Sequence, residues 1–293
     1  MATQFVRNSF ARLPKSYMCG IAGYIGSQPP DDGAIARTLT WMTNRGPDDK
    51  GTYRHEYAGG NTVVLLHTRL SILDVSPRAA QPFRHRENVL CYNGEIYNYK
   101  ELRRELSCRG LQFQTESDTE VLAQWLACSG SNALDFCEGM WAFAFYDKAD
   151  GSLLLSRDRF GEKPLYLHRT KHGVYFASEV KFLNALLGRK FTPDLTQLTR
   201  YLVNGYKSLY KSGSTFFEAI EELPPGECLQ IDASGRAHSF AYWQADFEQQ
   251  DSAMSYETAV SGTRKALKRS VEIRLRSDVP LAFCLSGGVD SNV

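Results

Sequence analysis

The sequence predicts a layered α+β fold for most of the chain. Between Cys19 and about Glu222, segments that alternate like strands are interleaved with segments that have helical spacing. The clearest strand, Met140–Asp147, alternates bulky aromatic residues with mostly small ones. The clearest helix start has Ser117 and Glu120 in a capping-box pattern. Hairpins mixed with helices favour layered packing over strict βαβ winding.

Six segments are expected to form strands because they combine apolar runs with period-two alternation. In chain order they are Cys19–Gly26, Thr62–His67, Asn88–Asn93, Met140–Asp147, Ser152–Arg157 and Val174–Ser178.

Three helices are expected between these strands, each behind a capping residue. The first follows Asp31 and Asp32, and the second lies between Asn98 and Gly110. The third begins at the capping box of Ser117. The apolar positions of the first helix are Ile35, Leu39 and Met42, and those of the second are Leu102 and Leu106. Those of the third are Val121, Leu122, Trp125 and Leu126.

After the breaker Leu223–Gly226, the pattern changes. Residues 226–254 read as a connecting hairpin and a linker. A helix is expected from about Ser255 to Arg276, with an apolar face of Val260, Leu267, Val271 and Leu275. Val279–Leu285 is a continuous apolar run, which predicts a buried parallel strand. It leads into the glycine-containing loop Ser286–Ser291.

The composition is that of a soluble globular protein, with 43% hydrophobic and 23% charged residues and a net charge of +1. No basic stripe is present, which argues against a nucleic-acid or membrane-surface partner. No apolar run approaches the roughly 18 residues of a membrane span. The seven cysteines are scattered and odd in number, without any Cys-x-x-Cys. This pattern favours a reducing cytoplasm over a disulfide framework.

Residues 1–17 differ from the rest because they contain basic residues and no acid. Three interpretations compete for this leader. It is a mis-assigned start with Met18 as the true initiator, a propeptide whose removal exposes Cys19, or a transit peptide. We favour the first, because Met18 directly precedes Cys19.

A set of ordered motifs gives Cys19 its significance, since a lone cysteine is usually a plain strand residue. The motifs are Met18–Gly23, Asn44–Asp48, His67–Ile72, Tyr92–Asn98, Ser117–Glu120, Arg157–Tyr166 and Ser286–Ser291. Together they resemble the class II glutamine amidotransferases, most closely the glutamine-hydrolysing asparagine synthetases. The resemblance covers nearly everything from Met18 to Ser291. Asn44 departs from it, because the family more often has His before Arg-Gly-Pro-Asp, and so does the leader.

The resemblance implies a four-layer αββα glutaminase domain with an N-terminal nucleophile, over residues 18–225. It also implies that residues 255–293 begin an α/β synthetase domain of the ATP-pyrophosphatase type, which this chain truncates. The function implied is that of a glutamine-dependent asparagine synthetase. Such an enzyme hydrolyses glutamine to glutamate and ammonia, and it uses the ammonia with ATP to amidate aspartate. For this piece alone we expect glutaminase activity only.

Glutamine hydrolysis requires a nucleophile and a base, and a cysteine at a mature N-terminus supplies both. A thiol has a pKa of about 8.5 and an α-amine one of about 8, so the amine of Cys19 can take the thiol proton. The side chain of Asn93 and the backbone N–H of Gly94 would hold the oxyanion. Taken alone, Asn-Gly predicts a hairpin turn. No catalytic histidine is required, and His67 reads as a core or supporting residue.

Glutamine is distinguished from other amides by its amino-acid end. Arg69 would bind the α-carboxylate bidentately, and Asp118 would accept the α-ammonium with Glu95 beside it. The family pattern makes the remaining pocket lining Leu70, Ser71, Ile72 and Leu73.

The loop after the last predicted strand would bind ATP. Glycines there let backbone N–H groups close on phosphate oxygens. The residues implied are Leu285, Ser286, Gly287, Gly288, Asp290 and Ser291, and Asp290 would help to hold magnesium in the complete domain. The glutaminase step needs no cofactor.

Two alternatives remain open. The parent protein could amidate another carboxylate, on a polysaccharide or a secondary-metabolite precursor. A chain that keeps its leader would be a catalytically silent regulatory module, because an amide-linked Cys19 has no free amine. The expected partners are glutamine, aspartate and ATP, without nucleic acid or membrane, and a homodimer is left open.

Overall fold

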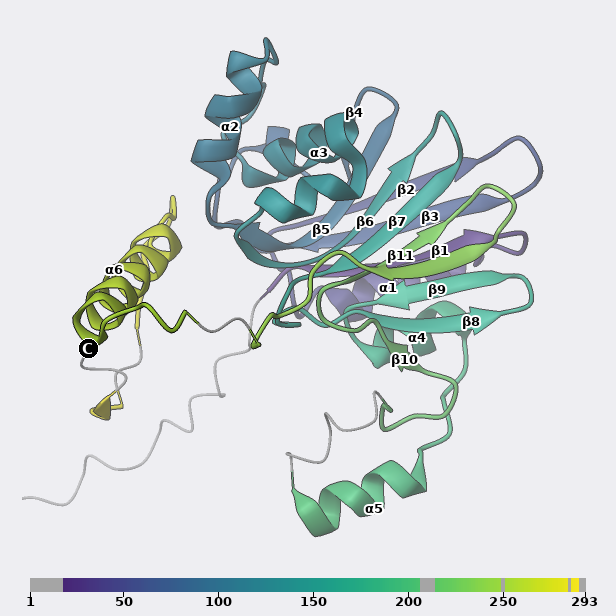
Figure 1. Cartoon of the computed structure of the whole chain (residues 1–293). Helices are drawn as coiled ribbons and strands as arrows, with labels where there is room; N and C mark the ends of the chain where they lie inside the picture. Colours follow the sequence, from purple (N-terminus) through teal and green to yellow (C-terminus); the bar gives the residue numbers. More distant parts are fainter. Residues whose placement is uncertain (1–17, 206–213, 249–250, 284–285, 290–293) are drawn as a thin grey trace, which may run out of the picture.

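The computed structural model describes residues 18–205, 214–248, 251–283 and 286–289. The leader 1–17 lies outside these residues, as do Leu285, Asp290 and Ser291. Figure 1 shows two stacked sheets with helices on both outer faces, and α6 outside these layers. The predicted α+β fold with four layers is confirmed by this arrangement.

The first sheet has the strand order β10-β8-β9-β1-β3-β2. All its pairings are antiparallel, and β1 lies at its centre between β3 and β9. Its strands are β1 (Gly20–Gly26), β2 (Asp49–Glu56), β3 (Thr62–Arg69), β8 (Tyr166–Thr170), β9 (Gly173–Ala177) and β10 (Glu221–Glu222).

The second sheet has the order β12-β11-β7-β6-β5-β4 and is also antiparallel. Its strands are β4 (Phe83–His85), β5 (Asn88–Ile96), β6 (Gly139–Asp147), β7 (Ser152–Arg157), β11 (Glu227–Ile231) and β12 (Ala237–Ala241). The hairpin expected within 226–254 is β11–β12, and β11 pairs with β7 as part of this sheet.

The helices cover the two outer faces. α1 (Asp32–Met42) and α4 (Val180–Leu187) belong to the first sheet, whose outer core includes Tyr24, Leu66 and Phe182. α2 (Tyr99–Cys108) and α3 (Asp118–Ser129) cover the second. The remaining helices are α5 (Leu195–Asn204), α6 (Tyr256–Arg274) and the 3₁₀ turns Pro77–Ala79 and Gly130–Phe136. No helix in the described ranges is long and apolar enough to cross a bilayer.

The alternation in β6 explains how the layers pack. Trp141, Phe143 and Phe145 point into the core under α2 and α3. Ala142 and Ala144 point the other way, into the core between the two sheets. Small side chains on that face let the sheets approach closely, and the large rings fill the wider space beneath the helices.

The expected helix starts are found, with two differences in detail. Asn98 precedes α2, but its side chain makes no cap bond and engages the Phe136 carbonyl and the Glu138 N–H instead. Asp31 accepts from the Ala34 N–H at 2.6 Å, and Ser117 accepts from the Thr119 N–H at 3.1 Å. The Glu120 carboxylate does not close a capping box on Ser117. It accepts instead from the N–H groups of Gln114 and Thr115, and so holds the turn that precedes α3.

The predicted strand at Val279–Leu285 is wrong for its described part. Val279–Phe283 is irregular and largely exposed, and no strand in the described residues pairs with it. A strand is stable only through hydrogen bonds to a neighbour. An apolar run alone was therefore not enough to predict a buried strand at these residues.

Candidate active site

A small cavity of about 190 Å³ opens where the two sheets meet α3. It lies beside Cys19, which immediately precedes β1 at the centre of the first sheet. The end of β5 and the loop after β3 form two of its walls. We call this loop, residues 70–76, the pocket loop. The lining residues are Met18, Cys19, Arg69, Leu70, Ile72, Leu73, Gln81, Tyr92, Asn93, Gly94, Glu95, Ser117, Asp118, Thr119, Met140 and Lys163.

The cavity brings together nearly all residues that the sequence selected for the glutaminase site. Ser71 is the exception, because it does not line the cavity. Its N–H donates to the Asp48 carboxylate at 2.7 Å, so it shapes the pocket loop from outside. His67 is fully buried, and its Nε2 lies 3.0 Å from the Tyr92 carbonyl, as expected of a supporting residue.

Cys19 is held at both its backbone and its sulfur. Its carbonyl accepts from Nε of Arg45 at 3.0 Å, and Arg45 is itself paired with Glu179 at 2.9 Å. The Sγ atom lies 3.4 Å from the N–H of Leu70 and 3.5 Å from its carbonyl. Burial raises the pKa of the Cys19 thiol, and the Leu70 N–H and the Arg69 charge oppose that rise. The resting thiol is therefore protonated and needs a base to become a nucleophile.

Asn93 carries a donor that no protein group uses. The residue is 1% exposed, and its Nδ2 has no hydrogen-bond partner in the described structure. A buried unpaired amide costs about 1–3 kcal/mol, so it is usually explained by a ligand or a water. Asn93 and Gly94 lie inside β5, so the hairpin turn that Asn-Gly predicts alone is not formed here.

Gly94 is required by its neighbours across the sheet. A Cβ atom on it would lie 2.1 Å from the Met140 carbonyl and 2.8 Å from the Trp141 Cα. Only glycine lets β5 and β6 approach so closely at the wall of the cavity. The backbone of Gly94 therefore lines the cavity without a side chain to fill it.

Arg69 ties the pocket loop to the end of β3. Its guanidinium donates to the carbonyls of Ser76 at 3.0 Å and Leu73 at 3.3 Å, and also to that of Asp74. An arginine has five N–H groups, so two remain for a ligand. The structure thus gives Arg69 a second role besides the predicted binding of a carboxylate.

Two carboxylates share one side of the cavity. Asp118 is buried at the first residue of α3, and it accepts from the Tyr92 hydroxyl and the Ile96 N–H, both at 2.9 Å. Burial raises the pKa of Asp118. Burial, followed by the Asp118 charge, raises the pKa of Glu95 to about 7, and Lys163 opposes this rise. Such a pair favours a cationic group between its members.

The sequence did not select several lining residues: Met18, Gln81, Tyr92, Ser117, Thr119, Met140 and Lys163. Lys163 is the one with charge. The buried Asp158 carboxylate accepts from the backbone N–H of Lys163 at 3.0 Å, and this bond fixes the turn that places Lys163 at the cavity. Asp158 and Lys163 both belong to the motif Arg157–Tyr166, so that motif is the sequence signal that could have identified Lys163.

The predicted ATP loop is only partly described. Ser286, Gly287 and Gly288 are exposed and do not line the cavity. The Gly288 N–H donates to the Ser286 hydroxyl at 3.3 Å. The other predicted members, Leu285, Asp290 and Ser291, lie outside the described residues.

Comparisons with known proteins show which families this chain resembles. A family model described as a glutamine amidotransferase domain matches residues 18–243, and one described as asparagine synthase matches residues 262–293. Glutamine-hydrolysing asparagine synthetase 1 of Bacillus subtilis is 34% identical over 94% of this chain and 43% of its own length. Glutamine-hydrolysing asparagine synthetase B of Escherichia coli is 36% identical over 86% of this chain and 39% of its own. The chain thus spans about two fifths of these relatives.

A solved structure shares the fold. Glutamine phosphoribosylpyrophosphate amidotransferase from B. subtilis, complexed with ADP and GMP, superposes with a TM-score of 0.57 at 20% identity. The match covers 78% of this chain and 50% of that one.

Proposed function

We propose that this chain, which belongs to the glutamine amidotransferase family, hydrolyses the side-chain amide of glutamine at Cys19. The observation that carries the proposal is the cavity itself. It places a thiol, an unused buried amide donor and two carboxylates around one small space. Those are the groups needed to attack an amide, hold its oxyanion and bind an α-ammonium.

The reaction begins with the α-amine of a Cys19 that has no residue before it. The neutral amine takes the thiol proton, and sulfur bonds to the amide carbon of the glutamine side chain. The amide oxygen gains a negative charge and accepts from Nδ2 of Asn93 and the N–H of Gly94. The proton then passes to the amide nitrogen, and the C–N bond breaks. Ammonia departs, and a γ-glutamyl thioester remains on Cys19. Water hydrolyses the thioester to glutamate and restores the thiol.

Recognition of glutamine is assigned to the opposite side of the cavity. Asp118 and Glu95 would bind the α-ammonium, and an N–H group of Arg69 that the pocket loop does not use would bind the α-carboxylate. Leu70, Ile72 and Leu73 would enclose the methylenes. An amide that lacks the amino-acid end leaves buried polar groups unpaired, so we expect it to be rejected.

A free amine at Cys19 is the condition that tests this function. Met18 lines the cavity, and its Sδ accepts from Nζ of Lys163 at 3.4 Å. Two otherwise identical chains should be compared, one beginning at Cys19 and one keeping residues 1–18. We expect only the first to release ammonia and glutamate from glutamine, with intact mass confirming each N-terminus. An active enzyme that retains residues 1–18 would refute the N-terminal mechanism.

The pH dependence of glutamine hydrolysis should report Glu95. Its pKa of about 7 leaves it neutral below that pH and charged above it. The pocket therefore attracts an ammonium better as pH rises through 7. The Cys19 amine must be neutral to act as the base and titrates at about 8, so both groups shape the acid limb of kcat/KM. We expect Glu95→Gln to lower kcat/KM at pH 8 and to remove the part of this limb that belongs to Glu95, which leaves a limb set by the amine alone. Glu105→Gln, which changes an exposed glutamate that is paired with Arg109, is the matched control. If the acid limb of kcat/KM is unchanged in Glu95→Gln, the group that titrates near pH 7 is not Glu95.

For the whole protein we propose a glutamine-dependent asparagine synthetase in the cytoplasm. The match of residues 262–293 to an asparagine synthase model supports this. The ammonia would react with aspartate activated by ATP, bound in part by Leu285–Ser291. Asp290, the residue expected to help hold magnesium, lies outside the described residues. The six cysteines in the described ranges are free, which agrees with a reducing compartment.

A further inference from the structure

The pocket loop has no regular secondary structure, so a few named bonds determine its shape. It begins at Leu70, whose N–H and carbonyl flank the Cys19 sulfur. Ile72 and Leu73 then line the cavity. Asp74 adopts a positive φ of 45°, which a residue other than glycine keeps only when its surroundings enforce it. Small movements of this loop would therefore alter both the nucleophile and the cavity wall.

One residue that follows α6 holds this loop at two points. The backbone N–H of Asp278 donates to the Ile72 carbonyl at 3.1 Å. Its side-chain Oδ2 accepts from the Asp74 N–H at 2.7 Å. These two bonds bracket Leu73, so Asp278 clamps the backbone on both sides of a lining residue. The Asp74 carboxylate continues the chain of bonds, because it accepts from the Glu116 N–H at 2.8 Å.

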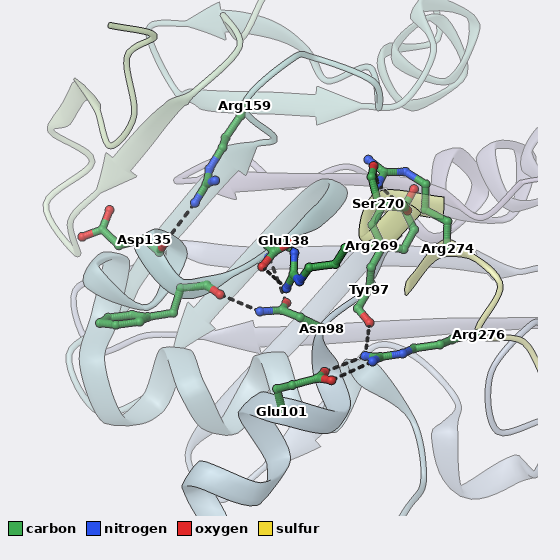
Figure 2. A network of polar contacts seen from close by, with 11 residues as sticks. Tyr97, Asn98, Glu101, Asp135, Glu138, Arg159, Arg269, Ser270, Arg274 and Arg276 are labelled. Carbon is green, nitrogen blue, oxygen red and sulfur yellow. Dashed lines mark hydrogen bonds and ion pairs between the residues drawn. The ribbon is translucent and has the colours of Figure 1, made fainter. Parts of the chain in front are cut away.

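Asp278 is in turn held against the glutaminase fold by arginines. We call residues 269–278 the docking segment. Arg269 forms two bonds of 2.6 and 2.7 Å to the Glu138 carboxylate, and Arg276 forms two of 2.6 Å to Glu101. Figure 2 shows both pairs as forks of the bidentate kind. Arg274 lies over the Tyr97 ring, 4.5 Å from its centre.

The docking segment reaches a second wall of the cavity through Tyr97. Arg276 donates to the Tyr97 carbonyl at 2.7 Å, a contact visible in Figure 2. Tyr97 directly follows β5, two residues after Glu95 in the cavity wall. The same ten-residue segment thus contacts the pocket loop on one side and the end of β5 on the other.

We propose that Asp278 is a positioning residue for the glutamine pocket, and that it fixes the pocket loop from the start of the synthetase segment. This inference rests on the proposed glutaminase function. Glutamine binding then depends on how the docking segment is seated, although that segment contributes no residue to the cavity. Asp278 touches neither the nucleophile nor the lining side chains, so its effect passes through the backbone of Ile72 and Asp74.

The test compares Asp278→Ala with Asp278→Asn in the chain beginning at Cys19. Asp278 is exposed, so neither change threatens the core. We expect the alanine variant to raise KM for glutamine about fivefold, with kcat within about twofold. It loses the side-chain bond to Asp74, while the backbone bond to Ile72 and the contacts of Leu70 with the Cys19 sulfur remain. The asparagine variant keeps a side-chain acceptor for the Asp74 N–H, and it should lie between wild type and alanine. Asp150→Ala is the matched control, because it removes an exposed aspartate that accepts from the Ser152 N–H at 2.8 Å and lies outside both the docking segment and the pocket loop.

Hydrogen exchange separates this inference from the proposed function. The amides of residues 70–76 should exchange several-fold faster in Asp278→Ala, while amides of β1 and β5 keep their protection. Unchanged exchange in the loop would overturn the clamp. Faster exchange with an unchanged KM would overturn its role in the pocket. A wild-type chain without glutaminase activity would refute the proposed function, and the exchange comparison would still decide whether Asp278 holds the loop.

Discussion

Replacing Cys19 by alanine is expected to abolish glutamine hydrolysis, lowering kcat by a factor on the order of 10⁴ or more. The Cys19 thiol is the strongest nucleophile among the described residues that line the cavity, so its loss removes the proposed covalent route. The residue as a whole is partly exposed, although its thiol is buried, and the sulfur makes only weak contacts with Leu70. The thermal midpoint should therefore change little. Release of ammonia and glutamate from glutamine, with a melting curve of the same sample, measures both.

The matched control is Cys108→Ala, which removes an exposed thiol at the end of α2. It should leave kcat, KM and the thermal midpoint unchanged. Alkylation by a thiol reagent should inactivate wild type and the Cys108 variant alike, and glutamine should protect both. Hydrolysis within tenfold of wild type in Cys19→Ala would show that another group is the nucleophile.

The sequence predicted the centre of the fold better than its margins. The β6 alternation of Trp141, Phe143 and Phe145 is strong because both faces of that strand are buried. β2, by contrast, was not expected, since Asp49–Glu56 is mostly polar. It lies at the edge of its sheet and exposes most of its residues, so burial imposes little alternation on it.

The residues of the candidate site also fall into two groups, those that the sequence predicted and those that only the structure revealed. Cys19, Asn93 and Asp118 were selected because their side chains carry the expected chemistry in recognisable motifs. Tyr92 and Met140 enter the cavity through the pairing of β5 with β6, which brings residues distant in sequence together. Pairing of that kind is not visible in either segment alone. The engagement of Arg69 with the pocket loop likewise depends on the path of residues 73–76, which no local pattern predicts.

The Asn93-Gly94 pair has two interpretations in the sequence, and the structure distinguishes between them. Alone, the pair predicts a hairpin turn, and the motif around it predicts an oxyanion site. In the structure the pair continues β5, with Asn93 opposite Ala142 and Gly94 opposite Trp141 on β6. The pairing with β6 runs along the whole of β5, so donors mounted on it are held in place before the reaction begins. That is the condition under which a hydrogen-bond donor stabilises a transition state most strongly.

Asn93→Ala is accordingly expected to lower kcat for glutamine hydrolysis by about 10²–10³, the range for loss of one oxyanion donor. KM should change little, because charge on the amide oxygen develops only in the transition state. The Asn93 Nδ2 has no acceptor in the described structure, so its removal breaks no protein hydrogen bond. Steady-state kinetics with a melting curve should therefore show a loss of rate without a comparable loss of stability.

Asn98→Ala provides the contrast, because the amide of Asn98 is fully engaged outside the cavity. Its Nδ2 donates to the Phe136 carbonyl at 2.8 Å, and its Oδ1 accepts from the Glu138 N–H at 2.9 Å. Loss of those bonds should lower the thermal midpoint and leave kcat nearly intact, the reverse of the result for Asn93. If Asn93→Ala instead lowers stability and spares kcat, the amide is structural, and the oxyanion must be held by the backbone alone.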